Sequence, residues 1–518
     1  MPGYPDAATS GTFGRSRQLF ADLEAELTAP ATDGLTHDEL EDLLSERGRT
    51  LMRQLFQDRA DLRACREQRR SAVTDTTGVT HNRVEPGHAT TLTTVFGPVT
   101  ATRIAYRAPG ASNLHPADAH WNTPTGTHSH GLRRLIATET PRGSFESAQA
   151  GVKRATGVRV GKRQIADITV AAAIDIPAFY TGRHHDPTSD PDKLLILTSD
   201  GKGVVMRPEA LRPATAKAAA ASGPRLSKRT SPGEKTGRKR MAELACVYDL
   251  EPRPRTPADI STSTSTSTST SSSSRGEVRA TDGESKHPRA AHKWMTASIT
   301  ANIPAVIATM FDEAERRDPT HQRSWVALVD GNNTQIEAIT TEAQRRGIDV
   351  GIVIDFVHVT EYIWKAAWTF FTPADPDAQD WVSDKLSKVL AGQARSVAAG
   401  IRRRASRYYA DHERKGADQA ATYLTNKAGY LRYDEALAAG WPIATGVIEG
   451  ACRYIVKDRL DITGARWGLA GAEAVLRLRA LHSNGDFDEY WRFHLRQEHR
   501  RNHLDRYQQS RSDYELAS

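Results

Sequence analysis

Three apolar segments of this 518-residue chain each end in an aspartate, and each segment has the composition of a buried strand. The segments KLLILTSD, WVALVD and DVGIVID end in Asp200, Asp330 and Asp355. Ligands of an open α/β sheet bind outside the carboxyl ends of its strands, so carboxylates placed there can converge. Asp200 and Asp330 are each followed by glycine, which leaves room for a backbone, a metal ion or a phosphate. A single aspartate at a strand end would indicate only a turn or a helix N-cap.

Clustered carboxylates suggest a specific chemistry. They repel one another, and each raises the pKa of its neighbours unless a cation offsets the charge. Oxygen ligands at an open site, without a cage of Cys or His, select Mg2+ or Mn2+. Two such ions about 3.5–4 Å apart are the usual apparatus of in-line displacement at a phosphodiester. The aspartates therefore predict phosphodiester chemistry with two Mg2+ ions, for which Mn2+ is the expected substitute.

The elements that must position these aspartates indicate an α/β core. KLLILTSD and GVVMR are the first two expected strands, joined by a turn at 201–203, and MAELACVYDL is the third. Helices are expected at about 303–317 and 334–346, before the strands WVALVD and DVGIVID. The order is βββαβαβ. Residues 359–440 then have helical spacing and hold no obvious strand. A tract of only Ser and Thr, 261–274, is predicted to be a disordered loop insertion.

The part of the chain before this core predicts helices and one hairpin. Thr36 and Glu39 have the spacing of a capping box, and leucines at helical spacing follow them. Residues 90–107 change to a two-residue period and predict a β-hairpin joined near Gly97 and Pro98.

Residues 144–178 predict a helix-turn-helix, although any αα-hairpin gives the same pattern. Ser144 is expected to cap the first helix, Gly157 to end it, and the second helix to begin near Gly161. The N-terminal end of a recognition helix meets phosphates and base edges. The candidate DNA contacts at that end are Lys162, Arg163 and Gln164.

The positive charge of the chain is concentrated in one stretch. The net charge is +7, and residues 201–250 hold 11 basic and 4 acidic residues, which equals the whole excess. A basic block spaced by Ser, Gly and Pro suits a polyanion such as nucleic acid, and a solvated surface loop is the alternative. The block consists of Arg225, Lys228, Arg229, Lys235, Arg238, Lys239 and Arg240.

Composition excludes several other classes of protein. The chain is 38% hydrophobic and 26% charged, which is typical of globular domains and not of collagen or coiled coils. Cys65, Cys246 and Cys452 stand far apart without a CxxC pair, so a disulfide framework and a zinc finger are excluded. No stretch has the pattern of a signal peptide or a membrane span. We therefore expect a cytoplasmic protein with no membrane partner, associated with the nucleoid when bound to DNA.

Four segments of the chain occur in a recognisable order. They are TSDGKGV, RRDPTHQRSWVALVDGNNTQ, IVIDFVHVTEYIWKAA and GVIEGACRYIVKDRLDITGARWGLAGAEAVLRLRAL. These segments resemble bacterial insertion-sequence transposases of the ISKra type, which belong with the Mutator-like DDE enzymes. The resemblance covers roughly residues 90–485. It implies an RNase H-like catalytic core with an all-helical insertion between the fifth strand and the last catalytic helix, in agreement with the strand order above.

The resemblance also implies roles for individual residues. Asp200, Asp330 and Glu449 correspond to the catalytic residues that hold two Mg2+ ions, one for the attacking water or 3′-hydroxyl and one for the leaving oxygen. Asp355 and His358 resemble a motif after the fifth strand, which implies support of the active site; a structural hydrogen bond is the alternative for the histidine. Three cations after Glu449 are candidate contacts to the DNA backbone or else helix-surface charges: Arg453, Lys457 and Arg459.

The implied activity is that of a transposase. Such an enzyme binds the terminal inverted repeats of its element, cleaves double-stranded DNA at the element ends, and joins the 3′-hydroxyl ends to target DNA. The alternatives are an RNase H-like nuclease without strand transfer and a non-catalytic, domesticated or decayed DNA-binding protein. Because two ends must be cut together, we expect a homo-oligomer on DNA.

The expected domain order combines these predictions. It is an N-terminal helical region (1–75), a β-hairpin region (76–120), a helix-turn-helix region (121–185), the first part of the core (190–358, with a disordered insertion at 253–285), a helical insertion (359–440), the catalytic helix region (441–485) and a basic C-terminal tail (486–518).

Overall fold

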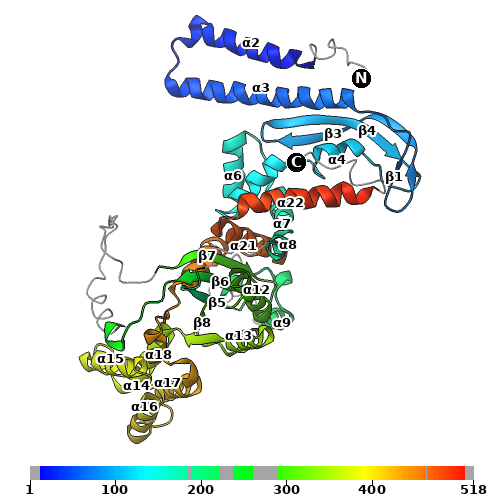
Figure 1. Ribbon diagram of the computed structural model, residues 1–518. Coiled ribbons are helices and arrows are strands. Elements are labelled where there is room, and N and C mark those ends of the chain that lie inside the picture. Colours follow the sequence, from blue (N-terminus) through cyan, green and yellow to red (C-terminus); the bar gives the residue numbers. More distant parts are fainter. Residues whose placement is uncertain (1–11, 184–189, 222–236, 261–288, 463, 508–518) are drawn as a thin grey trace. The chain divides into compact units, whose positions relative to one another are not determined.

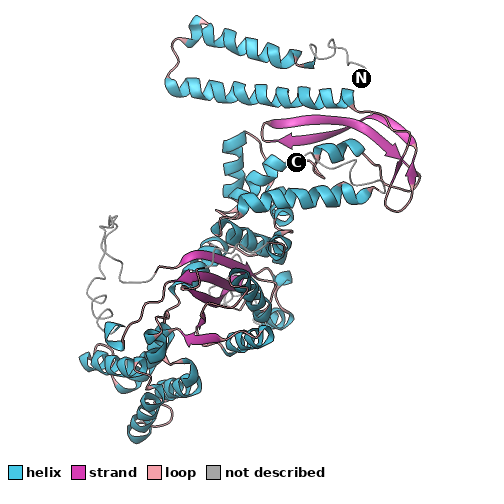
Figure 2. Cartoon of the chain, in the orientation of Figure 1, coloured by secondary structure: helices cyan, strands magenta, loops and turns pink. Residues whose placement is uncertain are grey.

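The computed structural model describes residues 12–183, 190–221, 237–260, 289–462 and 464–507 (Figure 1). The protein is rich in helix and has a mixed α/β architecture with one five-stranded sheet (Figure 2). The chain divides into two compact units: residues 1–182 with 486–518, and residues 183–485. Within the described residues, no helix is long and apolar enough to cross a membrane.

The first unit begins with two helices and a long hairpin. The capping box is confirmed, since the backbone N–H of Thr36 donates to Glu39 Oε2 at 2.9 Å. The hairpin near Gly97 is also confirmed, with Thr94 opposite Gly97 at its closed end. The elements are α2 (Gly14–Thr28), α3 (His37–Arg66), β1 (Val73–Thr74), β2 (Thr80–His81), β3 (Arg83–Thr94), β4 (Gly97–Arg107) and α4 (Pro116–Trp121).

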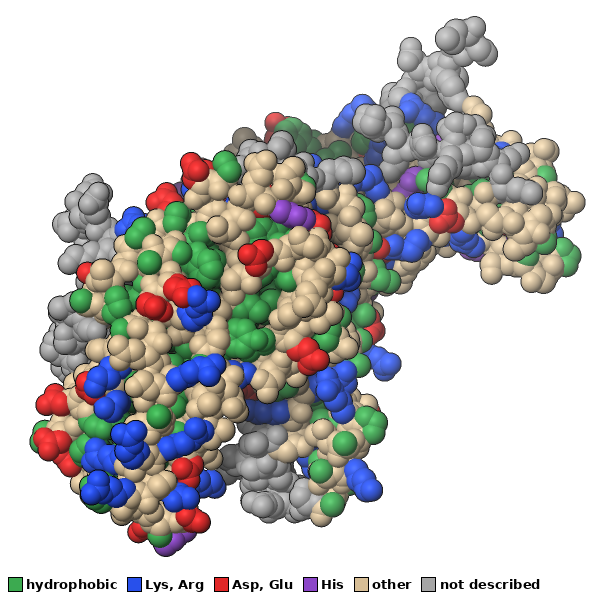
Figure 3. All heavy atoms as spheres, turned by 60° about the horizontal axis from the view of Figure 1, so that its bottom comes forward, with side chains coloured by type: hydrophobic (Ala, Val, Ile, Leu, Met, Phe, Trp, Pro, Cys, Tyr) green, Lys and Arg blue, Asp and Glu red, His purple; other side chains and the backbone are tan. Residues whose placement is uncertain are grey.

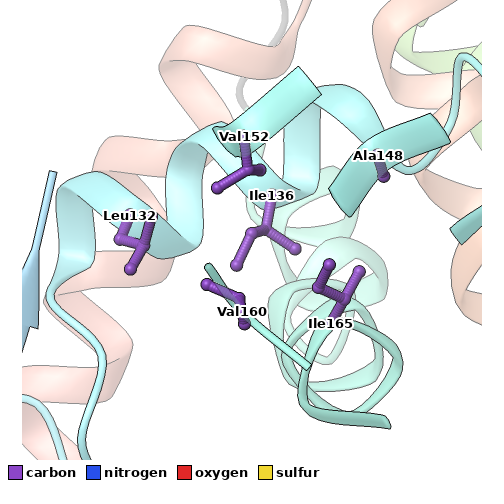
Figure 4. Close-up of a cluster of buried hydrophobic side chains, with 6 residues drawn as sticks. All are labelled: Leu132, Ile136, Ala148, Val152, Val160 and Ile165. Carbon is purple, nitrogen blue, oxygen red and sulfur yellow. The ribbon is translucent and has the colours of Figure 1, made fainter. Parts of the chain in front are cut away.

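A group of three short helices follows the hairpin. Ser144 Oγ accepts the N–H of Ser147 at 3.0 Å at the start of the second of these helices, and Gly157, with a φ of +73°, ends the same helix, both as expected. The apolar faces of the three helices form one buried cluster (Figure 4). The helices are α5 (His130–Glu139), α6 (Phe145–Thr156) and α7 (Lys162–Ala172), followed by α8 (Ile176–Thr181).

Much of the expected C-terminal tail is a helix of this first unit. Within 486–518, helix α22 (Phe487–Asn502) is followed by a short turn of 3-10 helix, and residues 508–518 lie outside the described part. Tyr490 Oη donates to the carbonyl oxygen of Ala172 at 2.6 Å, and Arg501 and His494 both reach Asp175. These partners lie more than 300 positions away along the chain, so the local pattern of basic and aromatic residues could not indicate them.

The second unit contains the five-stranded sheet, whose strand order is β7-β6-β5-β8-β9. The first three strands pair antiparallel, and β8 and β9 are parallel to β5. Helices α12 (Ile303–Arg317) and α13 (Asn333–Arg346) precede β8 and β9, as expected. The strands are β5 (Leu194–Val205), β6 (Lys239–Leu250), β7 (Ala291–Ser298), β8 (Trp325–Val329) and β9 (Val350–Ile354).

The βββαβαβ order is interrupted by one helix, α9 (Pro213–Ala221), between β5 and β6, and two of its strands were assigned wrongly from the sequence. The expected turn at 201–203 does not exist, and the first two expected strands are the single twelve-residue strand β5. Strand β6 pairs with every residue of β5, and this continuous ladder overrides the local turn preference of the glycines. The third strand of the sheet is β7, which follows the Ser/Thr tract.

A helical group follows β9, as the sequence predicts for 359–440. Its surface carries basic side chains interspersed with acidic ones (Figure 3). Its helices are α14 (Phe356–Phe370), α15 (Pro376–Leu390), α16 (Ala394–Tyr408), α17 (Lys415–Lys427) and α18 (Tyr433–Ala438). After it come α19 (Gly446–Ala451), the π-helix η4 (Cys452–Lys457), α20 (Asp458–Leu460) and α21 (Leu469–Ser483).

The expected disordered insertion at 253–285 is wrong at its beginning. The N–H of Arg255 donates to the carbonyl oxygen of Leu437 at 2.9 Å, and its guanidinium donates to that of Trp441 at 2.6 Å. Residues 251–260 are therefore bonded to the end of the helical group. The Ser/Thr tract itself lies outside the described residues.

We predict that the first unit becomes less stable as the pH decreases, because of His503. This side chain is 5% exposed, and its Nε2 lies 2.9 Å from the carbonyl oxygen of Thr123. Burial lowers the pKa of His503 from 6.5 to about 4, so between these values the unfolded chain binds a proton that the folded chain does not. Stability should be full above pH 6.5 and decline as the pH falls to about 4.

The urea midpoint of the first unit, followed by hydrogen exchange of its amides, tests this prediction. His503→Gln should make the midpoint depend less steeply on pH over that window. His37→Gln, at a side chain that is 87% exposed, is the matched control. Equal slopes in the His503 variant and the wild type would contradict the assignment.

Candidate active site

Asp200 lies in the middle of β5 and not at its end, but it lies where the neighbouring strand stops. Strand β8 pairs with β5 only as far as Thr198 opposite Leu328, and β5 continues with β6 alone. Asp200 and Asp330 each follow that last pair by two residues. Continuing the register places them opposite one another, on one face of strands about 4.8 Å apart. Both aspartates therefore lie just beyond the point where the pairing of β5 with β8 ends.

The carboxylate of Asp330 is oriented by the turn that follows β8. Its Oδ1 accepts the N–H of Asn332 at 2.8 Å, and its carbonyl oxygen accepts Tyr423 Oη at 3.4 Å. Gly331 has a φ of +91°, and a Cβ added to it would lie 2.8 Å from the hydroxyl of Tyr423. Glycine is required at this position both by the backbone conformation and by the close approach of the tyrosine.

The carboxylate of Asp200 accepts a hydrogen bond from a cysteine. From the sequence, the cysteines were excluded from a disulfide framework and a zinc finger, and no other role was predicted for them. Cys452 Sγ donates to Asp200 Oδ2 at 3.2 Å, and the N–H of Gly201 donates to Oδ1 at 2.6 Å. Burial, and then the charge of Asp200, raises the pKa of the Cys452 thiol, which therefore stays protonated and remains a donor. Its position three residues after Glu449 was the available signal.

Glu449 lies on α19, one turn before Cys452, and is exposed. Helix α19 packs against β5 and β6. The third candidate ligand is therefore on the element next to Asp200. Within the part of the chain that the structure describes, however, no three His, Cys, Asp or Glu side chains are close enough to hold a metal ion together. Asp200 and Asp330 both lie where the pairing of β5 with β8 ends, and Glu449 lies on the helix that packs against β5.

Asp355 directly follows β9, as Asp330 directly follows β8, but Asp355 is buried. Residue pairing between β8 and β9 ends at Val329 opposite Ile354, so Asp355 comes next to Asp330. Its side chain is 0% exposed. Oδ1 accepts the N–H of Val357 at 2.7 Å, and Oδ2 accepts both the N–H (3.1 Å) and the hydroxyl of Thr445. Both oxygens are thus occupied by protein donors.

Thr445 is the residue before α19, so Asp355 and Asp200 hold the two ends of one segment. Asp355 binds its beginning through Thr445, and Asp200 binds Cys452 at its end. Glu449 lies between these two attachments. Asp355 therefore positions the segment that carries Glu449, and its expected support of the active site stays a prediction. His358 is half-buried, and its Nδ1 lies 3.8 Å from Glu361 Oε2.

Asp355→Ala should destabilise the second unit. The substitution leaves the N–H of Val357 and the buried N–H and hydroxyl of Thr445 without their acceptor, at roughly 1–3 kcal/mol for each buried unsatisfied group. We expect a fall of about 3 kcal/mol in the free energy of unfolding, measured by urea denaturation of the second unit, and faster hydrogen exchange of α19.

Asp349→Ala is the matched control, because Asp349 is exposed and lies just before the same strand. It should change the midpoint little. The stabilising role of the Asp355–Thr445 contact would be refuted if both variants unfolded at the same urea concentration with unchanged hydrogen exchange of α19.

A groove of about 770 Å3 lies next to Asp330 between α14 and α17. Tyr362 and Tyr423 stack in it with ring centroids 3.9 Å apart, and Lys365 Nζ lies 4.3 Å from the Tyr362 ring. Lys427 also lines the groove and bonds to Asn333. Burial lowers the pKa of Lys427, and the charge of Asp330 opposes this shift. The sequence analysis missed these four side chains, since only the folding of α14 against α17 brings them to Asp330.

The expected DNA contacts on α7 have mixed outcomes. Arg163 is exposed, and Lys162 is exposed with its Nζ 2.6 Å from Glu146 Oε1. Gln164 Oε1 accepts the N–H of Gly161 at 3.1 Å, so this side chain caps its own helix.

The basic block at 225–240 is described only at its end. Arg225, Lys228, Arg229 and Lys235 lie outside the described residues. Lys239 and Arg240 begin strand β6, directly after Arg238, and Arg240 Nε donates to the carbonyl oxygen of Ile299 at 2.9 Å.

Of the three cations after Glu449, one is wrongly assigned to DNA. Arg453 and Lys457 are exposed, and Arg453 lies 3.9 Å from Asp458. Arg459 is only 2% exposed; its guanidinium carbon lies 4.7 Å from the centre of the Trp467 ring, and burial lowers its pKa to about 10. The π-helix η4 has a wider turn than an α-helix, so a regular 3.6-residue spacing does not predict which side chains after it face inward.

Comparison with known proteins leaves the family open. No family model and no curated protein matches the chain. Among solved structures, it is similar to a chain of the Drosophila P element transposase strand transfer complex, at 10% identity and a TM-score of 0.23, over 74% of this chain and 83% of that chain. A TM-score this low does not establish a shared fold.

Proposed function

We propose that this protein is a DDE transposase with an RNase H-like core, which cleaves the ends of its element and joins them to target DNA. One observation supports the proposal: Asp200 in β5 and Asp330 directly after β8 each lie two residues beyond the last paired residues of these two strands. The segments that resemble ISKra-type transposases contain both aspartates and Glu449.

The residues at this site fit hard divalent cations. The candidate ligands are carboxylate oxygens, which suit these ions, and the nearby thiol of Cys452 donates a hydrogen bond to Asp200. Asp200 and Asp330 would hold Mg2+, with the exposed side chain of Glu449 completing the set. Bound Mg2+ would activate the attacking water or 3′-hydroxyl and stabilise the leaving oxygen.

The other side chains of the site act by orientation. Cys452 and the N–H of Gly201 each donate to one oxygen of Asp200, and the N–H of Asn332 donates to one oxygen of Asp330, so both carboxylates are oriented before any ligand binds. Asp355 holds the segment that carries Glu449. Such preorganisation lowers the cost of assembling the site when DNA arrives.

DNA is the proposed partner. The pair α6–α7 would act as a helix-turn-helix, with the exposed cations Lys162 and Arg163 at the first turn of its second helix. Two element ends must be cut together, so the proposal includes a homo-oligomer on DNA.

Strand cleavage and strand transfer on a labelled duplex carrying the element's own end test this function. We expect Mg2+-dependent cleavage and joining in the wild type, abolished by EDTA. Asp330→Asn removes one ligand, and a loss of several kcal/mol of transition-state stabilisation corresponds to about 10²–10³-fold in rate. Asp349→Asn should retain wild-type rates.

The remaining outcomes separate the alternatives. Cleavage without joining would indicate a nuclease on the same core. Binding without cleavage, equal in the wild type and Asp330→Asn, would reject catalysis and leave a DNA-binding protein.

A further inference from the structure

A second basic feature lies in the first unit, far along the chain from the proposed active site. A groove of about 680 Å3 runs along the C-terminal part of α3, β4 and α4. Its lining includes five arginines and one glutamate. Three arginines follow one another at about one-turn spacing on α3, and two come just after the helix ends. They are Arg59, Arg63, Arg66, Arg69 and Arg70.

The acidic groups around this arginine groove are already engaged. Asp118 pairs with Arg103 at 2.9 Å. Glu67 accepts the N–H of Ile104 at 2.9 Å, and burial raises the pKa of its carboxyl group. Burial also lowers the pKa of Arg63, although Asp118 and Glu67 oppose the shift. The protein thus concentrates positive charge here and neutralises only part of it.

The groove beside Asp330 gives an internal comparison. Its lining holds three lysines and two aspartates, so its formal charge is +1 with histidine neutral (3 − 2). The arginine groove has a formal charge of +4 by the same arithmetic (5 − 1). Of these two grooves in the described residues, the arginine groove has the larger excess of positive charge and is the better match for a polyanion.

The walls of the arginine groove hold some of these groups in place. The guanidinium carbon of Arg63 lies 4.8 Å from the centre of the Trp121 ring, and the N–H of Arg70 donates to Tyr106 Oη at 2.7 Å. Arg59, Arg66 and Arg69 are exposed. A planar guanidinium matches phosphate oxygens in a bidentate geometry, so a row of arginines suits a repeating phosphate chain.

The length of the row fits a nucleic-acid strand. Arg59 and Arg66 lie seven residues apart on α3, which corresponds to about 10 Å along the helix axis. Phosphates of one strand of duplex DNA advance by about 3.4 Å per nucleotide along the duplex axis, so roughly three nucleotides span the row.

We propose that the arginine groove binds the sugar-phosphate backbone of double-stranded DNA, as a contact additional to the first turn of α7. The choice of DNA as the polyanion rests on the proposed function. The contact is electrostatic and independent of base sequence, because guanidinium groups bind phosphates in it and phosphate contacts carry no sequence information directly.

The salt dependence of DNA binding by the full chain tests the groove. Fluorescence anisotropy with a labelled duplex would give the dissociation constant at several salt concentrations. The triple variant Arg59→Gln, Arg66→Gln, Arg69→Gln removes exposed arginines and keeps Arg63 and Arg70, which contact the walls. Each lost phosphate contact reduces the slope of log K against log salt by about 0.9, so we expect a reduction of about 2.7.

A control with the same change in charge separates this groove from general electrostatics. Arg15→Gln, Arg142→Gln, Arg492→Gln removes three exposed arginines from scattered positions of the same unit. This control should keep the wild-type slope. The proposal fails if the groove variant keeps the wild-type slope, or if both variants lose the same amount.

Failure of the groove and failure of the proposed function remain distinguishable. If the groove variant shows the expected change of slope but the wild-type protein never cleaves the element end, the groove proposal stands and the transposase proposal is rejected. Normal cleavage by a groove variant with an unchanged slope would retain the transposase and reject the groove.

Discussion

A single buried carboxylate connects the sheet of the second unit to the segment that returns from its helical group. Asp355 follows β9 and accepts hydrogen bonds from Val357, at the start of α14, and from Thr445, just before α19. A buried carboxylate is stable only when its oxygens have donors, and here the donors come from the two ends of the segment between β9 and α19. Asp355 therefore specifies where the chain leaves the sheet and where it comes back.

Neighbouring hydrogen bonds also join the end of β9 to the last part of the helical group. The N–H of Phe356 donates to the carbonyl oxygen of Ile443 at 2.8 Å, and Tyr433 Oη donates to that of Ile354 at 2.8 Å. Asp355 and Thr445 are 90 positions apart, and bringing the ends of a long loop together costs entropy that grows only slowly with length. A few buried hydrogen bonds suffice to hold the helical group at the sheet, and they place α19 against β5 and β6.

The catalytic proposal depends on this geometry more than on the identity of the aspartates. Asp200 lies within a continuous strand, and it is available because β8 ends beside it. Cys452 bonds to Asp200 and in this way holds η4 at β5, while Asp355 holds Thr445. Glu449 is exposed between the two attachments, so its carboxylate has freedom to move toward a metal while its backbone is held.

The sequence by itself determined the features that depend on neighbours a few positions away. The capping box at Thr36, the N-cap at Ser144, the left-handed Gly157 and the hairpin at Gly97 follow from local hydrogen bonds and backbone sterics. Periodicity likewise located the helical group after β9. Only tertiary structure decided that 201–203 continue a strand, that Arg459 is buried against Trp467, and that Asp355 binds Thr445. Arg459 follows the wider turn of η4, and Thr445 returns to Asp355 only after the helical group that follows β9. All three depend on partners from other elements, and a pairing across such distances leaves no periodic signal in either segment alone.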